Sequence, residues 1–177
     1  MEEPISGTEV YSGRAISIRV DEVRKPNGKT TTRDVVAHSD CIVVVPIDQD
    51  NNVLLVRQYR YPVGSDLLEL PAGGIEAGED PVDCLRRELQ EEIGFLPGRI
   101  ETLGGFYSIP GYGTEYLYSY AVHDLQPSRL VAEDTDEIEI VKIPLQDIPG
   151  LIESGKICDA KSIAALLTYM ARKKLLS

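Results

Sequence analysis

The stretch GGIEAGEDPVDCLRRELQEEIGF, residues 73–95, decides the fold of this chain. Asp80 can cap a helix, Pro81 suits the first helical position, and Gly94 suits the position just beyond the last turn. We therefore expect a helix of roughly three turns between Asp80 and Gly94. Its apolar side chains recur at helical spacing and give it one face to bury. They are Val82, Leu85, Leu89 and Ile93.

Three glutamates lie close together on this expected helix. Glu88 and Glu92 are four positions apart and Glu91 is three from Glu88, so their carboxylates project from neighbouring sectors and repel one another. A divalent cation would relieve this repulsion, and ligation by oxygen alone favours Mg²⁺ or Mn²⁺. The alternative is a solvated acidic face in which Arg86 and Arg87 are the helical ion-pair partners.

The whole stretch fits the pattern GX5EX7REUXEEXGU, in which U is a bulky aliphatic or aromatic residue, at all nine specified positions. This pattern is the Nudix box, and the chain resembles the Nudix hydrolases. The resemblance implies that Glu88, Glu91, Glu92 and the backbone carbonyl of Ala72 bind the catalytic divalent cations, and it places Glu91 and Glu92 among the catalytic residues. It also implies a structural role for four further box positions. These are Gly73, Glu79, Arg87 and Gly94.

Two segments outside the box narrow the resemblance. Arg57-Gln58-Tyr59-Arg60 and the segment LELPAG at 68–73 resemble the ADP-ribose pyrophosphatase branch, as does Pro110, which lies 16 positions beyond Gly94. This implies hydrolysis of ADP-ribose to AMP and ribose 5-phosphate. GDP-mannose or another nucleoside diphosphate sugar is the alternative substrate. A sensor that binds a nucleotide without cleaving it is the alternative of another class, although such a module would be expected to lose box glutamates.

The same resemblance suggests which residues contact the substrate. Arg60, Arg57 and Arg33 would bind phosphate or ribose, since a guanidinium matches phosphate oxygens in a bidentate manner. Glu115, in the loop that follows Pro110, matches a substrate-contacting position. The alternatives are exposed strand arginines and an ordinary loop carboxylate.

An acidic segment supplies candidates for the general base that accepts a proton from the attacking water. Asp136 aligns best with the glutamate that serves this purpose in relatives, but aspartate is one methylene shorter. Asp134 or Glu137 could therefore take the role, and a plain solvated acidic loop is the alternative. The choice depends on hydrogen-bond reach, which sequence alone does not give.

The pattern along the rest of the chain predicts an α/β (α+β) fold. Segments 8–24 and 30–38 flank Asn27-Gly28, which suits a tight turn, so residues 1–38 read as an N-terminal β-hairpin or small antiparallel sheet. The apolar run Cys41–Val45 reads as a buried strand. For residues 39–177 the resemblance implies a Nudix α/β/α sandwich around a mixed β-sheet, and for residues 1–38 a dimerisation segment in a homodimer. Further elements are expected at 53–61, 100–107, 115–123 and 137–143 as strands and at 159–170 as a helix.

Composition limits the partners and the compartment. With 29 acidic and 18 basic residues, the formal charge of −11 argues against a nucleic-acid partner but allows a small anionic substrate beside a bound cation. No apolar run reaches the roughly 18 residues of a membrane span, and no targeting segment is evident. Three scattered cysteines are typical of neither a disulfide framework nor a zinc site. We expect a cytoplasmic protein.

Overall fold

The computed structural model describes residues 1–132 and 137–175. The chain divides into two compact units. Unit 1 comprises Met1–Asp40 with Tyr107–Tyr116, and unit 2 comprises Cys41–Phe106 with the rest of the chain from Leu117.

Unit 1 is a three-stranded antiparallel sheet in the order β1-β2-β3. The strands are β1 (Glu3–Ser12), β2 (Ser17–Arg24) and β3 (Thr30–Ala37). The predicted turn at Asn27-Gly28 joins β2 to β3, with Gly28 at a φ of 81°. The predicted small antiparallel sheet is confirmed, with three strands rather than the two of a hairpin, because a second turn, closed by a hydrogen bond from Gly13 N to Ile16 O, separates β1 from β2.

Unit 2 contains two sheets, ordered β10-β5-β6 and β7-β4-β9-β8. β4 pairs with β9 in parallel and with β7 in antiparallel fashion, so the second sheet is mixed. The strands are β4 (Cys41–Pro46), β5 (Asn52–Arg60), β6 (Ser65–Glu69), β7 (Ala72–Gly74), β8 (Phe95–Tyr107), β9 (Tyr116–Pro127) and β10 (Glu139–Pro144). The helices are α1 (Pro81–Glu88), the π-helix η1 (Leu89–Ile93), the 3-10 helix η2 (Leu145–Asp147), α2 (Ile148–Glu153) and α3 (Ala160–Arg172).

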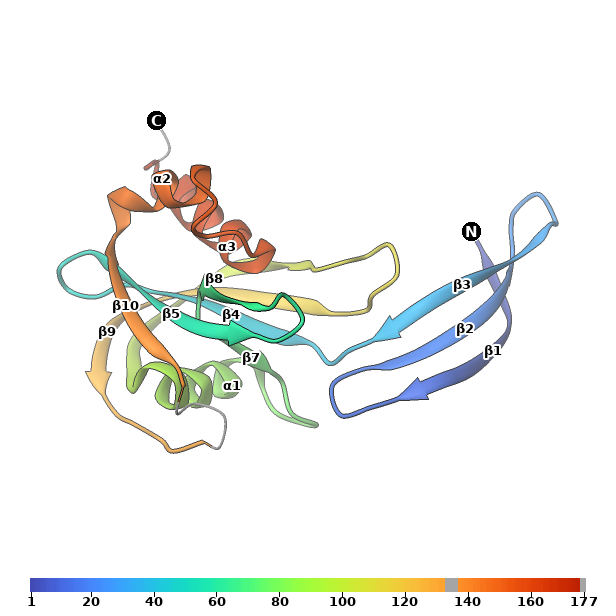
Figure 1. Cartoon of the computed structure of the whole chain (residues 1–177), viewed down its shortest axis with the longest axis horizontal. Helices are drawn as coiled ribbons and strands as arrows, with labels where there is room; N and C mark the ends of the chain where they lie inside the picture. Colours follow the sequence, from blue (N-terminus) through green and yellow to red (C-terminus); the bar gives the residue numbers. More distant parts are fainter. Residues whose placement is uncertain (133–136, 176–177) are drawn as a thin grey trace. The chain divides into compact units, whose positions relative to one another are not determined.

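Alternation along the central strands produces two hydrophobic layers. Val43 and Val45 of β4 pack in a cluster with residues of α2 and α3, whereas Ile42 and Val44 pack in a second cluster with residues of α1 and η1. All four side chains are fully buried, as the continuous apolar run predicted. α1 lies on one side of the sheets and α2 and α3 lie on the other (Figure 1). The predicted α/β/α sandwich with a mixed sheet is confirmed.

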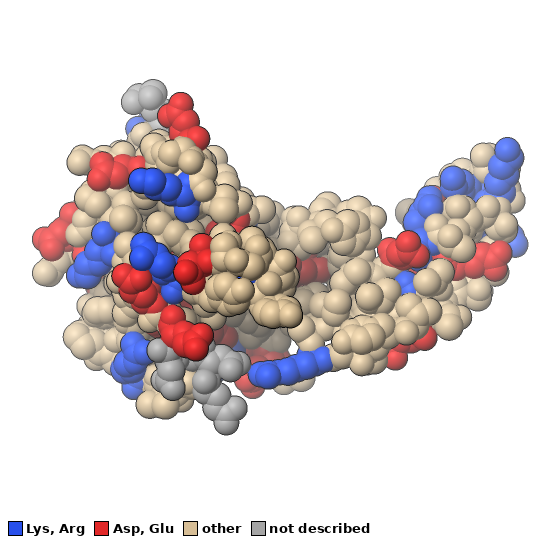
Figure 2. Space-filling view, in the orientation of Figure 1, with Lys and Arg blue, Asp and Glu red and all other residues tan. Residues whose placement is uncertain are grey.

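None of the helices in the described parts of the chain is long and apolar enough to cross a membrane. On the face drawn in Figure 2, basic and acidic side chains of unit 2 are intermixed, so its described residues form no continuous basic patch there.

Candidate active site

The box helix begins as predicted and ends differently. Asp80 caps α1 by accepting a hydrogen bond from Val82 N at 2.8 Å, and Pro81 is the first helical residue. After Glu88 the helix widens into η1, where Gly94 N donates to the carbonyl of Leu89, five residues earlier. A single regular α-helix as far as Gly94 is therefore wrong. The wider turn is of the kind that recurs at functional sites.

The three box glutamates have different surroundings. The Glu88 carboxylate packs directly against Gly73, leaving no room for a side chain at that position. Glu92, which is 8% exposed, accepts a hydrogen bond from Ala72 N at 3.2 Å. Glu91 accepts one from the Nη1 of Arg87 at 3.2 Å. Glu88 and Glu92 thus meet the Ala72–Gly73 segment of β7 from the box helix.

Electrostatics make this group of carboxylates unfavourable without a cation. Burial, and after it the Glu88 carboxylate, raise the pKa of Glu92 to about 8. Burial also raises the pKa of Glu88, although Arg87 opposes the change. Among the described residues, no lysine or arginine forms an ion pair with Glu92. The buried Glu92 carboxylate, which has no such partner, and the neighbouring Glu88 and Glu91 offer oxygen ligands that suit a hard divalent cation, so this donor set fits Mg²⁺ or Mn²⁺.

Arg87 joins the box loop to the box helix. Its Nε and Nη2 donate to the two oxygens of Glu79 at 2.9 and 3.0 Å, and Nη2 also donates to the carbonyl of Gly74 at 3.1 Å. The bond from Arg87 lowers the pKa of Glu79 to about 2. Arg87 Nη1 further contacts Glu88 at 2.7 Å and Glu91 at 3.2 Å, whereas Arg86 pairs with Asp83.

The predicted substrate arginines lie in three settings. Arg60, at the end of β5, binds the buried Glu69 and keeps 37% of its side chain exposed. Arg57 is an exposed strand residue that pairs with Glu139 of β10 at 3.0 Å. Arg33 lies in unit 1, where it pairs with Glu2. Of the three, Arg60 is the one bound to the segment 68–73 that leads into the box, through Glu69.

Pro110 and Glu115 belong to unit 1. The Glu115 carboxylate lies 3.8 Å from Nδ1 of His38. Glu115 and His38 border a small, largely apolar cavity of about 140 Å³ within this unit, whose lining does not include Pro110. Its lining consists of Ile16, Val36, His38, Ser108, Ile109, Tyr112, Gly113 and Glu115.

Two of the candidate bases, Asp134 and Asp136, lie outside the described residues, and Glu137 is exposed. A larger cavity of about 370 Å³ borders His123 and Lys142, and Phe95 is the one box residue in its lining. In the described part of the chain, the position of the box glutamates therefore cannot be identified from the size of a cavity.

Sequence reasoning missed Glu69 and Lys161 as part of this neighbourhood. Glu69 is 3% exposed and holds both Arg60 and Lys161. One signal was available: in the β5–β6 hairpin Glu69 pairs with Val56, which puts its side chain on the same face as that of Arg60.

Comparison with known proteins gives matches over most of the chain. The NUDIX domain model matches residues 37–166. The ADP-ribose pyrophosphatase of Bacillus subtilis (strain 168) is 32% identical over 177 residues, covering 99% of this chain and 95% of the relative. The methanol dehydrogenase activator of Bacillus methanolicus is 34% identical, covering 93% and 90%. The GDP-mannose pyrophosphatase of Yersinia pestis (strain Pestoides F) is 31% identical, covering 67% and 64%.

A solved structure described as an ADP compounds hydrolase superposes with a TM-score of 0.89 and 22% identity, covering 99% of this chain and 97% of the other. At that identity the likeness supports the fold. Together with the box geometry and the match over 37–166, it confirms the family predicted from the sequence: this chain belongs to the NUDIX family.

Proposed function

We propose that this chain is a divalent-metal-dependent hydrolase that cleaves the pyrophosphate of a nucleoside diphosphate linked to another group, with ADP-ribose as its substrate and Mg²⁺ as its metal. The observation that carries the hydrolase assignment is the buried Glu92 carboxylate, which faces Ala72 beside Glu88 without a cationic partner among the described residues. The choice of ADP-ribose rests on the near full-length similarity to the Bacillus subtilis protein of that name.

Each residue then has a stated task. Glu88, Glu91, Glu92 and the carbonyl of Ala72 hold the cations, which when bound neutralise pyrophosphate oxygens and acidify the attacking water. Arg60 donates to a phosphate oxygen. We assign weaker substrate contacts to four residues. They are Arg57, Arg33, Glu115 and Pro110.

The reaction needs a base as well as the metal site. Water attacks one phosphorus, its proton passes to a carboxylate of the acidic segment, and the bond to the bridging oxygen breaks, giving AMP and ribose 5-phosphate. Asp136 is our first candidate for this base, followed by Asp134 and Glu137.

We also propose a cytoplasmic homodimer that uses unit 1 as its dimerisation segment. The three free cysteines are compatible with a reducing compartment. Sedimentation at micromolar concentration should give twice the monomer mass, and a monomer at all concentrations would contradict the dimer.

A second candidate substrate is GDP-mannose, which the Yersinia pestis relative favours by name. The name of the Bacillus methanolicus relative describes action on another protein, which keeps a non-catalytic role as the candidate of another class. The intact box glutamates support hydrolysis instead.

A substrate panel tests these alternatives. ADP-ribose, GDP-mannose, UDP-glucose and NADH are each incubated with the protein and Mg²⁺, and release of nucleoside monophosphate is measured. We expect selective, Mg²⁺-dependent release of AMP from ADP-ribose. Preference for GDP-mannose would replace the substrate, and tight binding without cleavage of any compound would refute the hydrolase.

A further inference from the structure

The Glu69 carboxylate is buried between two cations. Arg60 Nε donates to Glu69 Oε2 at 2.7 Å, and Nη2 of Arg60 lies 2.6 Å from the same oxygen. Lys161 Nζ donates to the other oxygen, Oε1, at 2.9 Å. A carboxylate that is 3% exposed is costly unless its charge is compensated, so both cations stabilise it in this position.

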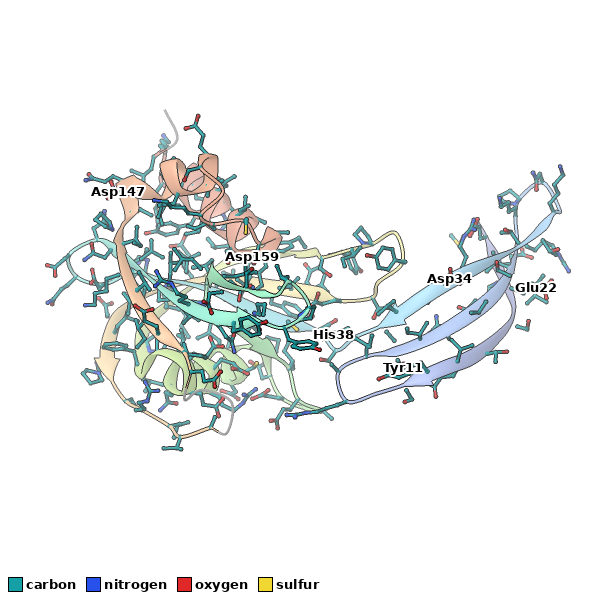
Figure 3. The ribbon with its side chains drawn as sticks, in the orientation of Figure 1. Tyr11, Glu22, Asp34, His38, Asp147 and Asp159 are labelled. Atoms are coloured by element: carbon teal, nitrogen blue, oxygen red, sulfur yellow. The ribbon has the colours of Figure 1, made fainter. Side chains whose placement is uncertain are left out.

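The start of α3 fixes Lys161 and the strand segment beside it. Asp159 caps α3 by accepting from Ser162 N at 3.1 Å, and it also accepts from Lys161 Nζ at 2.9 Å. Figure 3 marks Asp159 at the beginning of this helix. The fully buried Ser162 Oγ accepts a hydrogen bond from Leu70 N at 2.7 Å. The first turn of α3 therefore holds the residue that directly follows Glu69.

The same segment continues to the metal-binding glutamates. Two residues after Leu70, Ala72 N donates to Glu92. Arg60 Nη1 donates to no acceptor in residues 1–132 and 137–175, so it can bind an anion beside the box.

We propose that Glu69 and Lys161 are positioning residues that hold the Arg60 guanidinium ready for the substrate pyrophosphate, next to the metal glutamates. The identity of the anion rests on the proposed function. Glu69 fixes one edge of the guanidinium and leaves Nη1 free. The positive charge of Lys161 offsets part of the negative charge of Glu69. The Arg60 guanidinium therefore keeps enough positive charge to attract a phosphate group.

The decisive variant is Lys161→Met, with Lys161→Arg as the charge-preserving partner and the exposed Lys156→Met as the matched control. Calorimetry measures the affinity for Mn²⁺ alone and then for inorganic pyrophosphate at saturating Mn²⁺. We expect Lys161→Met to weaken pyrophosphate binding about tenfold, the size of one lost charge-assisted contact, with Mn²⁺ affinity unchanged. Lys161→Arg should recover most of the loss, and Lys156→Met should bind as the wild type does.

Turnover gives a second readout. Lys161→Met should raise the KM for ADP-ribose about tenfold and leave kcat close to that of the wild type. The contact that is weakened stabilises the bound substrate and the transition state equally, so its loss affects binding and not the chemical step. The double variant Arg60→Gln/Lys161→Met should be no worse than Arg60→Gln alone, since Lys161 acts through Arg60.

Three results would overturn the proposal that Glu69 and Lys161 position Arg60, the network of these three residues. They are unchanged pyrophosphate affinity in Lys161→Met, additive losses in the double variant, and no pyrophosphate binding by the wild type. If Lys161→Met does not fold, the isosteric Glu69→Gln takes its place, with the same expected loss. Because pyrophosphate binding needs no turnover, it decides the network even if the wild type fails to cleave ADP-ribose, a failure that would count against the proposed function instead.

Discussion

At the scale of single residues, Gly73 shows how closely the box is packed. A Cβ at this position would overlap the Glu88 carboxylate, so Gly73→Ala should push that carboxylate away and weaken divalent-cation binding about tenfold or more. Calorimetric titration with Mn²⁺ measures the change. Gly150→Ala is the control, because nothing lies within 4 Å of its added Cβ. Equal affinities in the two variants would show that the close contact with Glu88 does not matter.

Glu79 provides a pH-dependent test of the brace between loop and helix. Its bond to Arg87 lowers the pKa in the folded state from 4.5 to about 2, so its stabilisation is complete above pH 4.5 and is lost as the pH falls towards 2. Glu79→Gln should therefore lower the free energy of unfolding by about 1–2 kcal/mol at pH 7. Denaturant unfolding should show this difference shrinking between pH 5 and pH 2.5. A difference that stays constant with pH would rule out the ionic origin.

At the residue level, the motif fixes local spacing. Glu79 and Arg87, for which the resemblance implied a structural role, form a bidentate ion pair. Glu69 and Lys161 were missed because they are 92 residues apart and meet only in the folded chain. Asp134 and Asp136 lie outside the described residues.

At the scale of elements, the box helix ends in an unusual way that Gly94 makes possible. Its φ of 75° is left-handed, and the closest atoms to an added Cβ, those of Arg129, are at an ordinary 3.5 Å. Gly94→Ala should therefore cost about 1 kcal/mol through backbone conformation rather than steric overlap. Thermal unfolding beside Gly150→Ala measures this. A Gly94→Ala protein as stable as the wild type would mean that the end of η1 relaxes freely.

Elements with a strong periodic pattern were predicted well. The expected helix over 159–170 is α3, which spans Ala160–Arg172, and the expected strand over 53–61 is β5. The change from α1 to η1 was missed because, over a single turn, the spacing of the apolar residues is compatible with an α-helix and with a π-helix. The turn at 13–16 was missed because moderate alternation continues through it.

At the scale of the whole molecule, the apolar run of β4 was enough to predict a strand buried on both faces, and both layers are present. The pairing of β3 with a distant loop, through the bridge between Val36 and Gly113, was not predicted. Gly113 lies in the loop where the chain turns back between β8 and β9. The local sequence pattern does not show which distant strand such a loop will contact. Family resemblance supplied the architecture that periodicity alone left open.

The central claim is that the box glutamates hold the metal that cleaves the pyrophosphate, and Glu92→Gln tests it most directly. The measurement is Mg²⁺-dependent release of AMP from ADP-ribose by the wild type and by Glu92→Gln, after unfolding curves have shown both to be folded. We predict that kcat in the variant falls by about three orders of magnitude, as expected when several kcal/mol of metal-derived transition-state stabilisation are lost. Release of AMP by Glu92→Gln at a rate close to that of the wild type would contradict the account.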